Sequence, residues 1–306
     1  MAMLTVSGLR KRWGPVQALN GFDLHIEPGE ICGLIGHNGA GKTTFARTVA
    51  GLERPDAGSV LVAGVDLATA PRSARALIGL APQELALYPT ATLRQNLRLF
   101  GGLAGLRGTQ LRTELAAVAE ELILTDVLDR PIATLSGGQQ RRAQAATVLL
   151  PRPRVLLLDE PTVGADPTTR EALLRLVRTR ADEGAAICYT THYLPELEHL
   201  DATLAVAASG RVIARGHRAD LLDGLPGEVA VTFNGPVPEH LSRPSTAPGE
   251  LRFSTVDPAR ELAQLLRDLG PDTTRVRSAT IREPSLDDLY RSLATHQLPT
   301  GAHDAA

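Results

Sequence analysis

The chain has 306 residues, of which 43% are hydrophobic, 22% charged and 3% aromatic, and its formal net charge at pH 7 is -2. This composition is ordinary for a globular protein of about two domains, and it offers neither the basic surface nor the aromatic stacking platforms that nucleic-acid binding needs. No apolar run approaches the roughly 18 residues that span a bilayer, so we expect any work at a membrane to depend on a separate membrane-crossing chain.

The N-terminal segment contains two predicted strands, residues 4–7 and 22–26, and a basic turn follows the first of them. The only tryptophan of the chain, Trp13, lies in this turn, where a large apolar ring needs a specific role. Two roles are open at this point: a plug in the core, or a face on which an adenine ring stacks.

Residues 36–44 fit the pattern G-x-x-x-x-G-K-[ST], and they lie between a predicted buried strand over 31–35 and a predicted helix over 44–50. Glycines leave the loop open to a phosphate and able to take unusual dihedral angles, and the helix N-terminus adds partial positive charge. Lys42 is placed to reach the β- and γ-phosphates, and Thr43 to bind Mg²⁺. The predicted nucleotide-binding residues of this loop are Gly36, His37, Asn38, Gly39, Ala40, Gly41, Lys42, Thr43 and Thr44.

Two short strands, residues 59–63 and 77–81, precede a mostly helical pattern over 92–124 with a glycine-rich break at 101–108. After it comes a second glycine motif. Ser136 can cap a helix that runs to about residue 150, and the glycines expose its first amides to an anion. One γ-phosphate does not need two such helix ends from the same subunit, so this motif indicates that the chain assembles with another subunit. Its residues are Leu135, Ser136, Gly137, Gly138 and Gln139.

Residues 155–158 are apolar and end in Asp159 and Glu160, which places the two carboxylates at the carboxyl end of a predicted central parallel strand. Beside a phosphate loop, Asp159 would hold the Mg²⁺ shell and Glu160 would act as general base on the attacking water. The next strand, within residues 185–192, ends in His192, which we expect at the same ligand-binding edge. Between the two strands, residues 164–167 cap a helix that reaches about residue 182.

In this order the motifs resemble those of the nucleotide-binding subunit of an ATP-binding cassette (ABC) transporter, over about residues 3–222. The resemblance implies that Trp13 stacks on adenine and that Gln83 senses Mg²⁺ and the attacking water. It implies that His192 holds the γ-phosphate. The catalytic set is then Glu160, His192, Gln83 and Lys42, and the Mg²⁺ set is Thr43, Gln83 and Asp159.

The same resemblance implies a paired, head-to-tail arrangement of two subunits. Residues 135–139 spell LSGGQ, the signature of the family, and would close over ATP held by the opposite subunit. The D-loop of the family falls on Gly164, Ala165 and Asp166, and Ala165 stands where leucine is usual. We expect this departure to weaken a dimer contact without touching the phosphate chemistry.

The predicted fold class is α/β: a P-loop NTPase (RecA-like) core over residues 1–222, with a helical signature subdomain at about 84–150 and an antiparallel β subdomain. Predicted strands at 229–233, 251–255 and 274–281, a loop at 234–250 and helices at 258–269 and 285–293 then indicate a small α+β accessory domain over 223–295. Residues 296–306 are expected to be disordered. Residues 284–290 resemble a C-terminal motif of exporter ATPases of the daunorubicin-resistance type, and a plain capped helix is the alternative of nearly equal weight.

The leading hypothesis is therefore an ATPase, using ATP and Mg²⁺, that powers export of a drug, antibiotic or other hydrophobic compound through separate membrane permease subunits. Such a chain would work as a homodimer on the cytoplasmic face of the membrane, without nucleic acid, and the accessory domain would stabilise the dimer or tune its activity. One alternative is a soluble cassette ATPase that acts on chromatin, in DNA repair or on ribosomes. Another is a nucleotide sensor without turnover, against which intact Glu160 and His192 argue.

Overall fold

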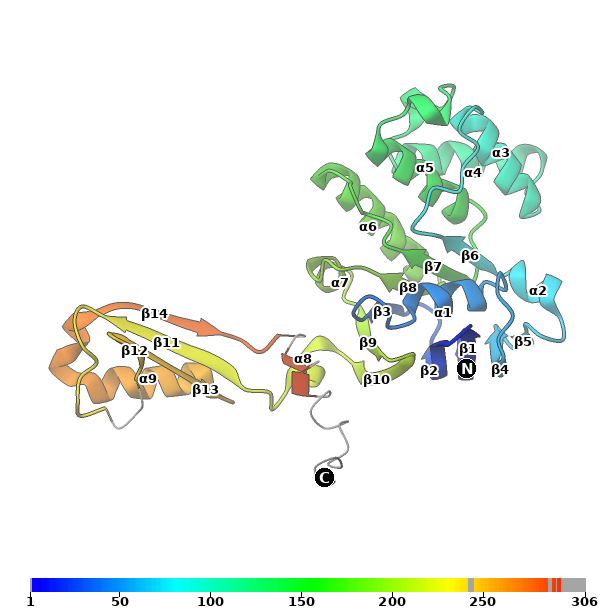
Figure 1. The fold of residues 1–306 in the computed structure, drawn as a ribbon. Helices are drawn as coiled ribbons and strands as arrows, with labels where there is room; N and C mark the ends of the chain where they lie inside the picture. The colour runs from blue at the N-terminus through cyan, green and yellow to red at the C-terminus, as the bar shows by residue number, and fades with distance from the viewer. Residues whose placement is uncertain (1, 242–244, 286–287, 290, 293–306) are drawn as a thin grey trace. The chain divides into compact units, whose positions relative to one another are not determined.

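The computed structural model describes residues 2–241, 245–285, 288–289 and 291–292 (Figure 1). The chain divides into two compact units, Met1–His217 and Arg218–Ala306. The second unit begins at Arg218 rather than at the expected residue 223, because the short helix α8 (Arg218–Leu222) groups with the residues that follow it. Each unit has its own hydrophobic core.

A six-stranded sheet forms the centre of the first unit, in the order β10-β9-β3-β8-β7-β6. Its strands are β3 (Ile31–Ile35), β6 (Ile78–Ala81), β7 (Val155–Asp159), β8 (Ala186–Thr190), β9 (Thr203–Ala208) and β10 (Arg211–Gly216). All pairings are parallel except that of β9 with β10. Every residue of β3, β7 and β8 is buried, as is typical of the centre of a parallel sheet. The loops that follow these strands therefore meet at one edge of the sheet.

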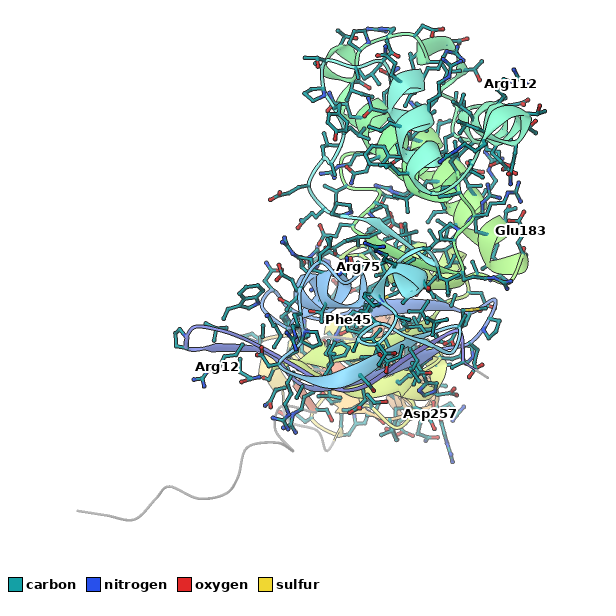
Figure 2. The ribbon with its side chains drawn as sticks, turned by 90° about the vertical axis from the view of Figure 1, so that its right-hand side faces the viewer. Arg12, Phe45, Arg75, Arg112, Glu183 and Asp257 are labelled. Atoms are coloured by element: carbon teal, nitrogen blue, oxygen red, sulfur yellow. The ribbon has the colours of Figure 1, made fainter. Side chains whose placement is uncertain are left out.

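An antiparallel sheet in the order β2-β1-β4-β5 packs beside the six-stranded sheet, which confirms the predicted antiparallel β subdomain. Its strands are β1 (Leu4–Trp13), β2 (Val16–Ile26), β4 (Ala57–Val62) and β5 (Val65–Asp66). The predicted strand over 4–7 is too short, because β1 continues its pairing with β2 through bulges as far as Trp13. The ring of Phe45, which is labelled in Figure 2, is fully buried. It stacks on Phe22 with centroids 4.6 Å apart, which joins this sheet to the first helix.

Seven helices of the first unit are α1 (Lys42–Val49), α2 (Pro71–Arg75), α3 (Leu93–Leu103), α4 (Gly108–Glu121), α5 (Gly137–Leu149), α6 (Pro167–Asp182) and α7 (Pro195–His199). Helices α3, α4 and α5 pack against one another as a helical region, with short 3₁₀ turns at Thr125–Val127 and Ile132–Thr134. Thr92 and Ser136 begin α3 and α5 with capping boxes, which explains why both helices start where they do. None of the helices in the described part of the chain has the length and apolar character needed to cross a bilayer.

The second unit contains an antiparallel sheet in the order β12-β13-β11-β14, with strands β11 (Gly227–Phe233), β12 (Ser245–Ala247), β13 (Glu250–Thr255) and β14 (Val276–Arg282). The amphipathic helix α9 (Pro258–Leu269) packs on this sheet. The predicted loop over 234–250 is wrong where β12 pairs with β13, and the predicted strand at 274 starts later because Gly270–Arg275 is a 3₁₀ helix. The final helix predicted over 285–293 lies partly, and the tail over 296–306 wholly, outside the described residues.

Candidate nucleotide-binding site

The phosphate loop connects the end of β3 to the first turn of α1. Gly39 and Gly41 have φ angles of 83° and 102°, in the left-handed region that favours glycine. Gly36 has a different reason for lacking a side chain, because a Cβ atom there would lie 2.5 Å from the carbonyl oxygen of Ala207 on β9. The expectation of an unusual dihedral is therefore wrong for Gly36, where close packing against the sheet excludes a side chain.

Lys42 begins α1, and its ammonium group lies against the loop. Nζ donates to the carbonyl oxygen of Gly36 at 2.5 Å and to that of His37 at 3.3 Å, and the residue is 9% exposed. Burial lowers the pKa of Lys42, while the negative charges of Glu160 and Asp159 oppose this shift. The loop thus holds a nearly buried cation beside the first amides of a helix, an arrangement that suits a phosphate.

Asp159 ends β7 and is held by two hydroxyl groups. Thr43 Oγ1 donates to Asp159 Oδ2 at 3.1 Å, and Thr190 Oγ1 on β8 donates to Asp159 Oδ1 at 2.5 Å. The structure therefore brings together Thr43 and Asp159, two of the three residues that the sequence places in the Mg²⁺ set. Their hard oxygen atoms are the ligand type that Mg²⁺ prefers, so the donor set fits this ion.

Glu160 is the centre of the polar contacts at this edge of the sheet. Its φ angle is 50°, an uncommon conformation for a residue with a side chain. The Glu160 amide donates to the carbonyl oxygen of Thr190 at 3.1 Å and to its hydroxyl at 3.0 Å. Gln83 Nε2 donates to Glu160 Oε2 at 3.0 Å, and His192 Nε2 lies 2.7 Å from Oε1. The three predicted catalytic residues after the phosphate loop thus form one contiguous group.

A cavity of about 670 Å³ opens onto this group. It is lined by Trp13, Val16, Ala18, Asn38, Gly39, Ala40, Gly41, Lys42, Thr43, Thr44, Gln83, Asp159, Glu160 and His192. Gly36 and His37 do not line it, and they contribute instead the carbonyl oxygens that hold Lys42. The cavity therefore collects most of the residues that the sequence assigned to nucleotide, metal and catalysis.

Trp13 lies in the wall of this cavity and is 45% exposed, so the alternative role as a core plug is wrong. Lys11 Nζ lies 4.7 Å from the centroid of the Trp13 ring. The turn of the β1–β2 hairpin presents the ring to the solvent beside the phosphate loop, where a flat aromatic ligand can stack on it.

The LSGGQ motif lies away from this cavity within the chain. Ser136 caps α5 through the amide of Gln139, and the Gln139 side chain accepts from the Ser136 amide. None of the motif's residues, Leu135 to Gln139, lines the cavity. Asp166 caps α6 through the Thr169 amide, and a Cβ atom built on Gly138 would lie 3.8 Å from Asp166 Oδ2. The signature motif and the predicted D-loop, Gly164 to Asp166, are therefore neighbours of each other.

Thr190, which is not among the predicted site residues, bridges the two acidic residues. Its hydroxyl donates to the Asp159 carboxylate and accepts from the Glu160 amide, and it is 2% exposed. A hydroxyl residue two places before His192, at the end of an apolar strand, was the only available signal. Its partners lie on the neighbouring strand and could not be paired with it before the sheet order was known.

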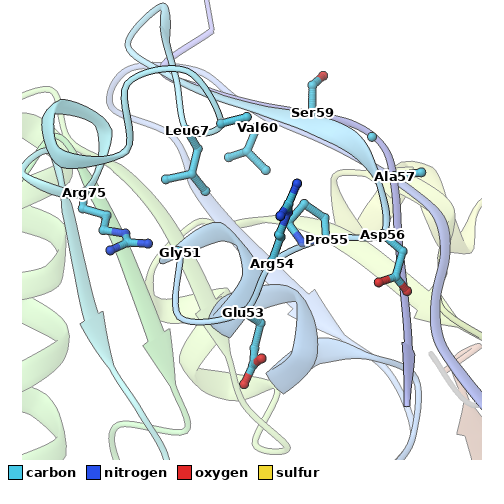
Figure 3. A pocket seen from close by; sticks show the side chains of 12 residues that line it. Gly51, Glu53, Arg54, Pro55, Asp56, Ala57, Ser59, Val60, Leu67 and Arg75 are labelled. Atoms are coloured by element: carbon cyan, nitrogen blue, oxygen red, sulfur yellow. The ribbon is translucent and has the colours of Figure 1, made fainter. Parts of the chain in front are cut away.

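A second cavity, of about 590 Å³, lies between the loop after α1, β4 and α2 (Figure 3). Arg54 and Arg75 line it together with the apolar side chains of Val60 and Leu67. It has no phosphate loop and no acidic strand end in its wall, and it contains none of the predicted site residues. The first cavity is therefore the candidate nucleotide site.

These features define a class of protein. A phosphate loop after one central strand, with an acidic pair at the end of another strand of the same parallel sheet, is the site of a P-loop nucleoside triphosphatase. The added antiparallel sheet and the LSGGQ motif at the start of α5 narrow the class to the ATP-binding cassettes.

The sequence profile of the ABC transporter family matches residues 19–163. The chain is 37% identical to a daunorubicin resistance ATP-binding protein of Streptomyces coeruleorubidus, over 97% of each chain, and 36% identical to a Nod factor export ATP-binding protein of Paraburkholderia xenovorans, over 78% of each. A solved structure of an ATP-binding subunit of an ABC transporter, 25% identical, superimposes with a TM-score of 0.71 and covers 95% of this chain and 99% of that one. The protein belongs to the ATP-binding subunits of the ABC transporter family, and it is an ATPase.

Proposed function

We propose that this chain hydrolyses ATP to power the export of a drug, an antibiotic or another hydrophobic compound through separate membrane subunits. The observation that carries the proposal is the placing of Glu160 between Gln83 and His192 at the cavity of the phosphate loop. The names of the relatives, which refer to drug resistance and to export, support the direction of transport and the kind of cargo.

The phosphate loop and Lys42 would hold the triphosphate of ATP, and Trp13 would stack on its adenine. Thr43, Asp159 and Gln83 would hold Mg²⁺. When bound, this ion neutralises charge on the phosphate oxygens. Lys42 supplies a fixed cation where negative charge gathers, which is the main electrostatic contribution of the chain itself to phosphoryl transfer.

Glu160 would take the proton of the attacking water. The contacts from Gln83 and His192 involve both carboxylate oxygens of Glu160, so together they fix the orientation of the carboxylate at the cavity. His192 would also contact the γ-phosphate and orient the water. A base held in this way contributes about 10²- to 10⁴-fold to the rate.

We also propose that two copies pair head to tail around ATP. Residues Ser136 to Gln139 form an exposed helix start away from the cavity of their own chain, and they are suited to close over the ATP of the partner. The D-loop residues Gly164, Ala165 and Asp166 lie next to this helix start and would enter the same interface. ATP would then stabilise the closed pair, and hydrolysis would reopen it.

The membrane subunits would dock on the segment after Gln83 and on α3. Large apolar side chains are exposed there, and the rings of Tyr88 and Phe100 lie 6.4 Å apart. The exposed set is Leu85, Tyr88, Leu99 and Leu103. This docking would hold the ATPase at the cytoplasmic face of the membrane, and the accessory domain, residues 223–295, would stabilise the pair or tune its activity.

The experiment is the solution mass of purified Glu160→Gln, with and without ATP and Mg²⁺, beside the wild type. We expect hydrolysis to fall by at least about 100-fold, because the general base is lost, while ATP binding remains. The trapped closed pair should then double the mass. A variant that binds ATP but stays monomeric would contradict the paired mechanism, and a variant that still hydrolyses ATP at the wild-type rate would contradict the role of Glu160. Identification of the hydrophobic chain that co-purifies from membranes tests the transport role.

A further inference from the structure

Glu196 on α7 is a carboxylate with four partners and is only 1% exposed. Its Oε1 atom accepts from Thr162 Oγ1 at 2.7 Å and lies 3.1 Å from Arg170 Nε. Its Oε2 atom accepts from Thr191 Oγ1 at 2.9 Å and from the Tyr189 hydroxyl at 3.0 Å. Burial and the nearby charge of Glu196 raise the pKa of Tyr189, which keeps this hydroxyl protonated as a donor.

The partners of Glu196 come from segments that each carry a residue of the proposed catalytic or dimer machinery. Thr162 lies in the loop just after Glu160, and Thr191 directly precedes His192. Arg170 lies in the first turns of α6, which Asp166 caps. A single buried carboxylate thus connects three segments: the acidic end of β7, the loop Thr191 to Tyr193 that carries His192 (the histidine loop), and the helix after the D-loop.

The histidine itself needs this support. His192 has a side chain that is 56% exposed and contacts Glu160. Thr191 Oγ1 donates to Glu196 and accepts from the amide of Tyr193, so this hydroxyl holds the backbone on both sides of His192. The Arg170 guanidinium also lies over the Tyr193 ring, 4.9 Å from its centroid. The contact of Thr191 is therefore with Glu196, and that of the Tyr193 ring is with Arg170, the ion-pair partner of Glu196.

A stability role alone does not explain why a charged group is kept at this position. Burying a carboxylate costs several kcal/mol before its partners offset the loss, and well-packed apolar residues often stabilise such a site equally well. A charged acceptor with three hydroxyl donors and one ion-pair partner has a different advantage, because it fixes the direction of each hydroxyl and the position of the cation. The segments it joins are those whose relative position sets the 2.7 Å contact between His192 and Glu160.

We propose that Glu196 and Arg170 are positioning residues for ATP hydrolysis, which hold His192 against Glu160 and link this contact to the D-loop through α6. The inference rests on the proposed roles of Glu160 and His192. Neither Glu196 nor Arg170 lines the nucleotide cavity, so they act through the residues they hold. A change in one of these segments, such as the approach of a second copy to the D-loop, would reach the histidine through this pair.

The test is steady-state ATP hydrolysis by Glu196→Gln, with ATP affinity measured separately from the fluorescence of Trp13, the only tryptophan, in the cavity wall. The amide keeps the volume but removes the negative charge and replaces one acceptor oxygen by a donor, so the partners of that oxygen lose their acceptor. We expect kcat to fall about 10- to 100-fold, with KM and Kd for ATP within about twofold of the wild type. A purely structural role would lower Tm without changing kcat per folded molecule.

A second pair of variants keeps the proposal testable if Glu196→Gln folds poorly. Arg170 is one-third exposed, and Arg170→Met should lower kcat while Arg170→Lys recovers part of it by restoring the charge. Arg180→Met is the matched control, because Arg180 lies on the same helix, is 2% exposed and pairs with Glu121 and Glu183, away from the cavity. We expect this control to lower Tm and to leave kcat unchanged.

Wild-type kcat in both Glu196→Gln and Arg170→Met would overturn the proposal, and so would a loss of kcat in Arg180→Met equal to that in Arg170→Met. Glu160→Gln in the same assay separates the positioning role of Glu196 from the catalytic role of Glu160. If it abolishes hydrolysis while Glu196→Gln does not, only the positioning role is wrong. If Glu160→Gln keeps the wild-type rate, the proposed catalytic role fails and the positioning role with it.

Discussion

The two compact units bury different kinds of side chain. Around the nucleotide cavity of the first unit, charged and hydroxyl groups such as Lys42, Asp159 and Thr190 are almost inaccessible to solvent. In the described part of the second unit no polar or charged side chain is buried, and the core is apolar. Its charged residues, such as Arg252 and Arg282, form ion pairs at the surface.

This difference separates the physical tasks of the two units. Buried polar groups cost free energy unless they are paired, so a core whose task is stability uses apolar contacts, as the core of the second unit does. The first unit keeps buried polar groups where they hold a phosphate loop, an acidic pair and a histidine loop. We therefore expect substitutions there to change activity more than stability, and the reverse in the accessory unit.

The largest effect should come from Lys42→Ala, which removes the cation of the phosphate loop. We expect kcat/KM for ATP to fall by about 10²- to 10³-fold, because a preorganised charge at the phosphates is lost. ATP hydrolysis and Trp13 fluorescence on titration with ATP measure this directly. Arg47→Ala on the same helix is the control, because Arg47 pairs with Glu53 and does not line the nucleotide cavity. Equal losses in both variants would contradict a specific role for Lys42.

Phe45→Ala tests the core of the first unit. The ring is fully buried and stacks on Phe22 between the antiparallel sheet and α1. We expect the free energy of unfolding to fall by about 3–5 kcal/mol, because a large cavity replaces the ring. Urea unfolding measures it. The variant should also weaken ATP binding, since α1 begins at Lys42, and unchanged ATP affinity would show that the helix start is held by other contacts.

Leu265→Ala makes the corresponding change in the accessory unit, where this leucine of α9 is 3% exposed. The free energy of unfolding of that unit should fall by about 2–5 kcal/mol. Hydrogen exchange of β11 and β13 measures this loss. The ATPase rate should stay within about twofold of the wild type while the unit is folded, because a buried leucine leaves the surface of the unit unchanged. A proportional loss of ATPase activity would break the separation between the two units.

The smallest effect concerns Glu30, just before β3. Burial acts to raise the pKa of this carboxyl, but the Thr203 hydroxyl, the Glu27 amide and Arg215 stabilise the charged form, and the net shift is downward. Its contribution to stability is therefore present above the unfolded pKa near 4.5 and is lost as pH falls through the lower folded value. Urea unfolding between pH 3 and 6 should be less pH-dependent in Glu30→Gln than in the wild type. Identical pH profiles would exclude the linkage.

Much of the fold could be read from the chain because local patterns and long-range packing agree. The apolar runs of β3, β7 and β8 contain almost no polar residue, so their burial in a parallel sheet followed from composition alone. Ser136 and Gln139 are spaced as a capping box, so the start of α5 was also determined locally. β12 was missed because three residues that pair only with β13 carry no pattern of their own.

The sequence by itself determined the phosphate loop, the acidic pair and the order of the motifs, because glycine, lysine and carboxylate at fixed spacings have few other uses. It did not determine that Gly36 packs on Ala207 or that Trp13 faces the cavity, since both depend on which strands are neighbours. The four partners of Glu196, three hydroxyl groups and one guanidinium, come from α6, β8 and two loops. Only the tertiary structure brings them to one carboxylate, because hydrogen bonds between segments distant in sequence leave no periodic trace in it.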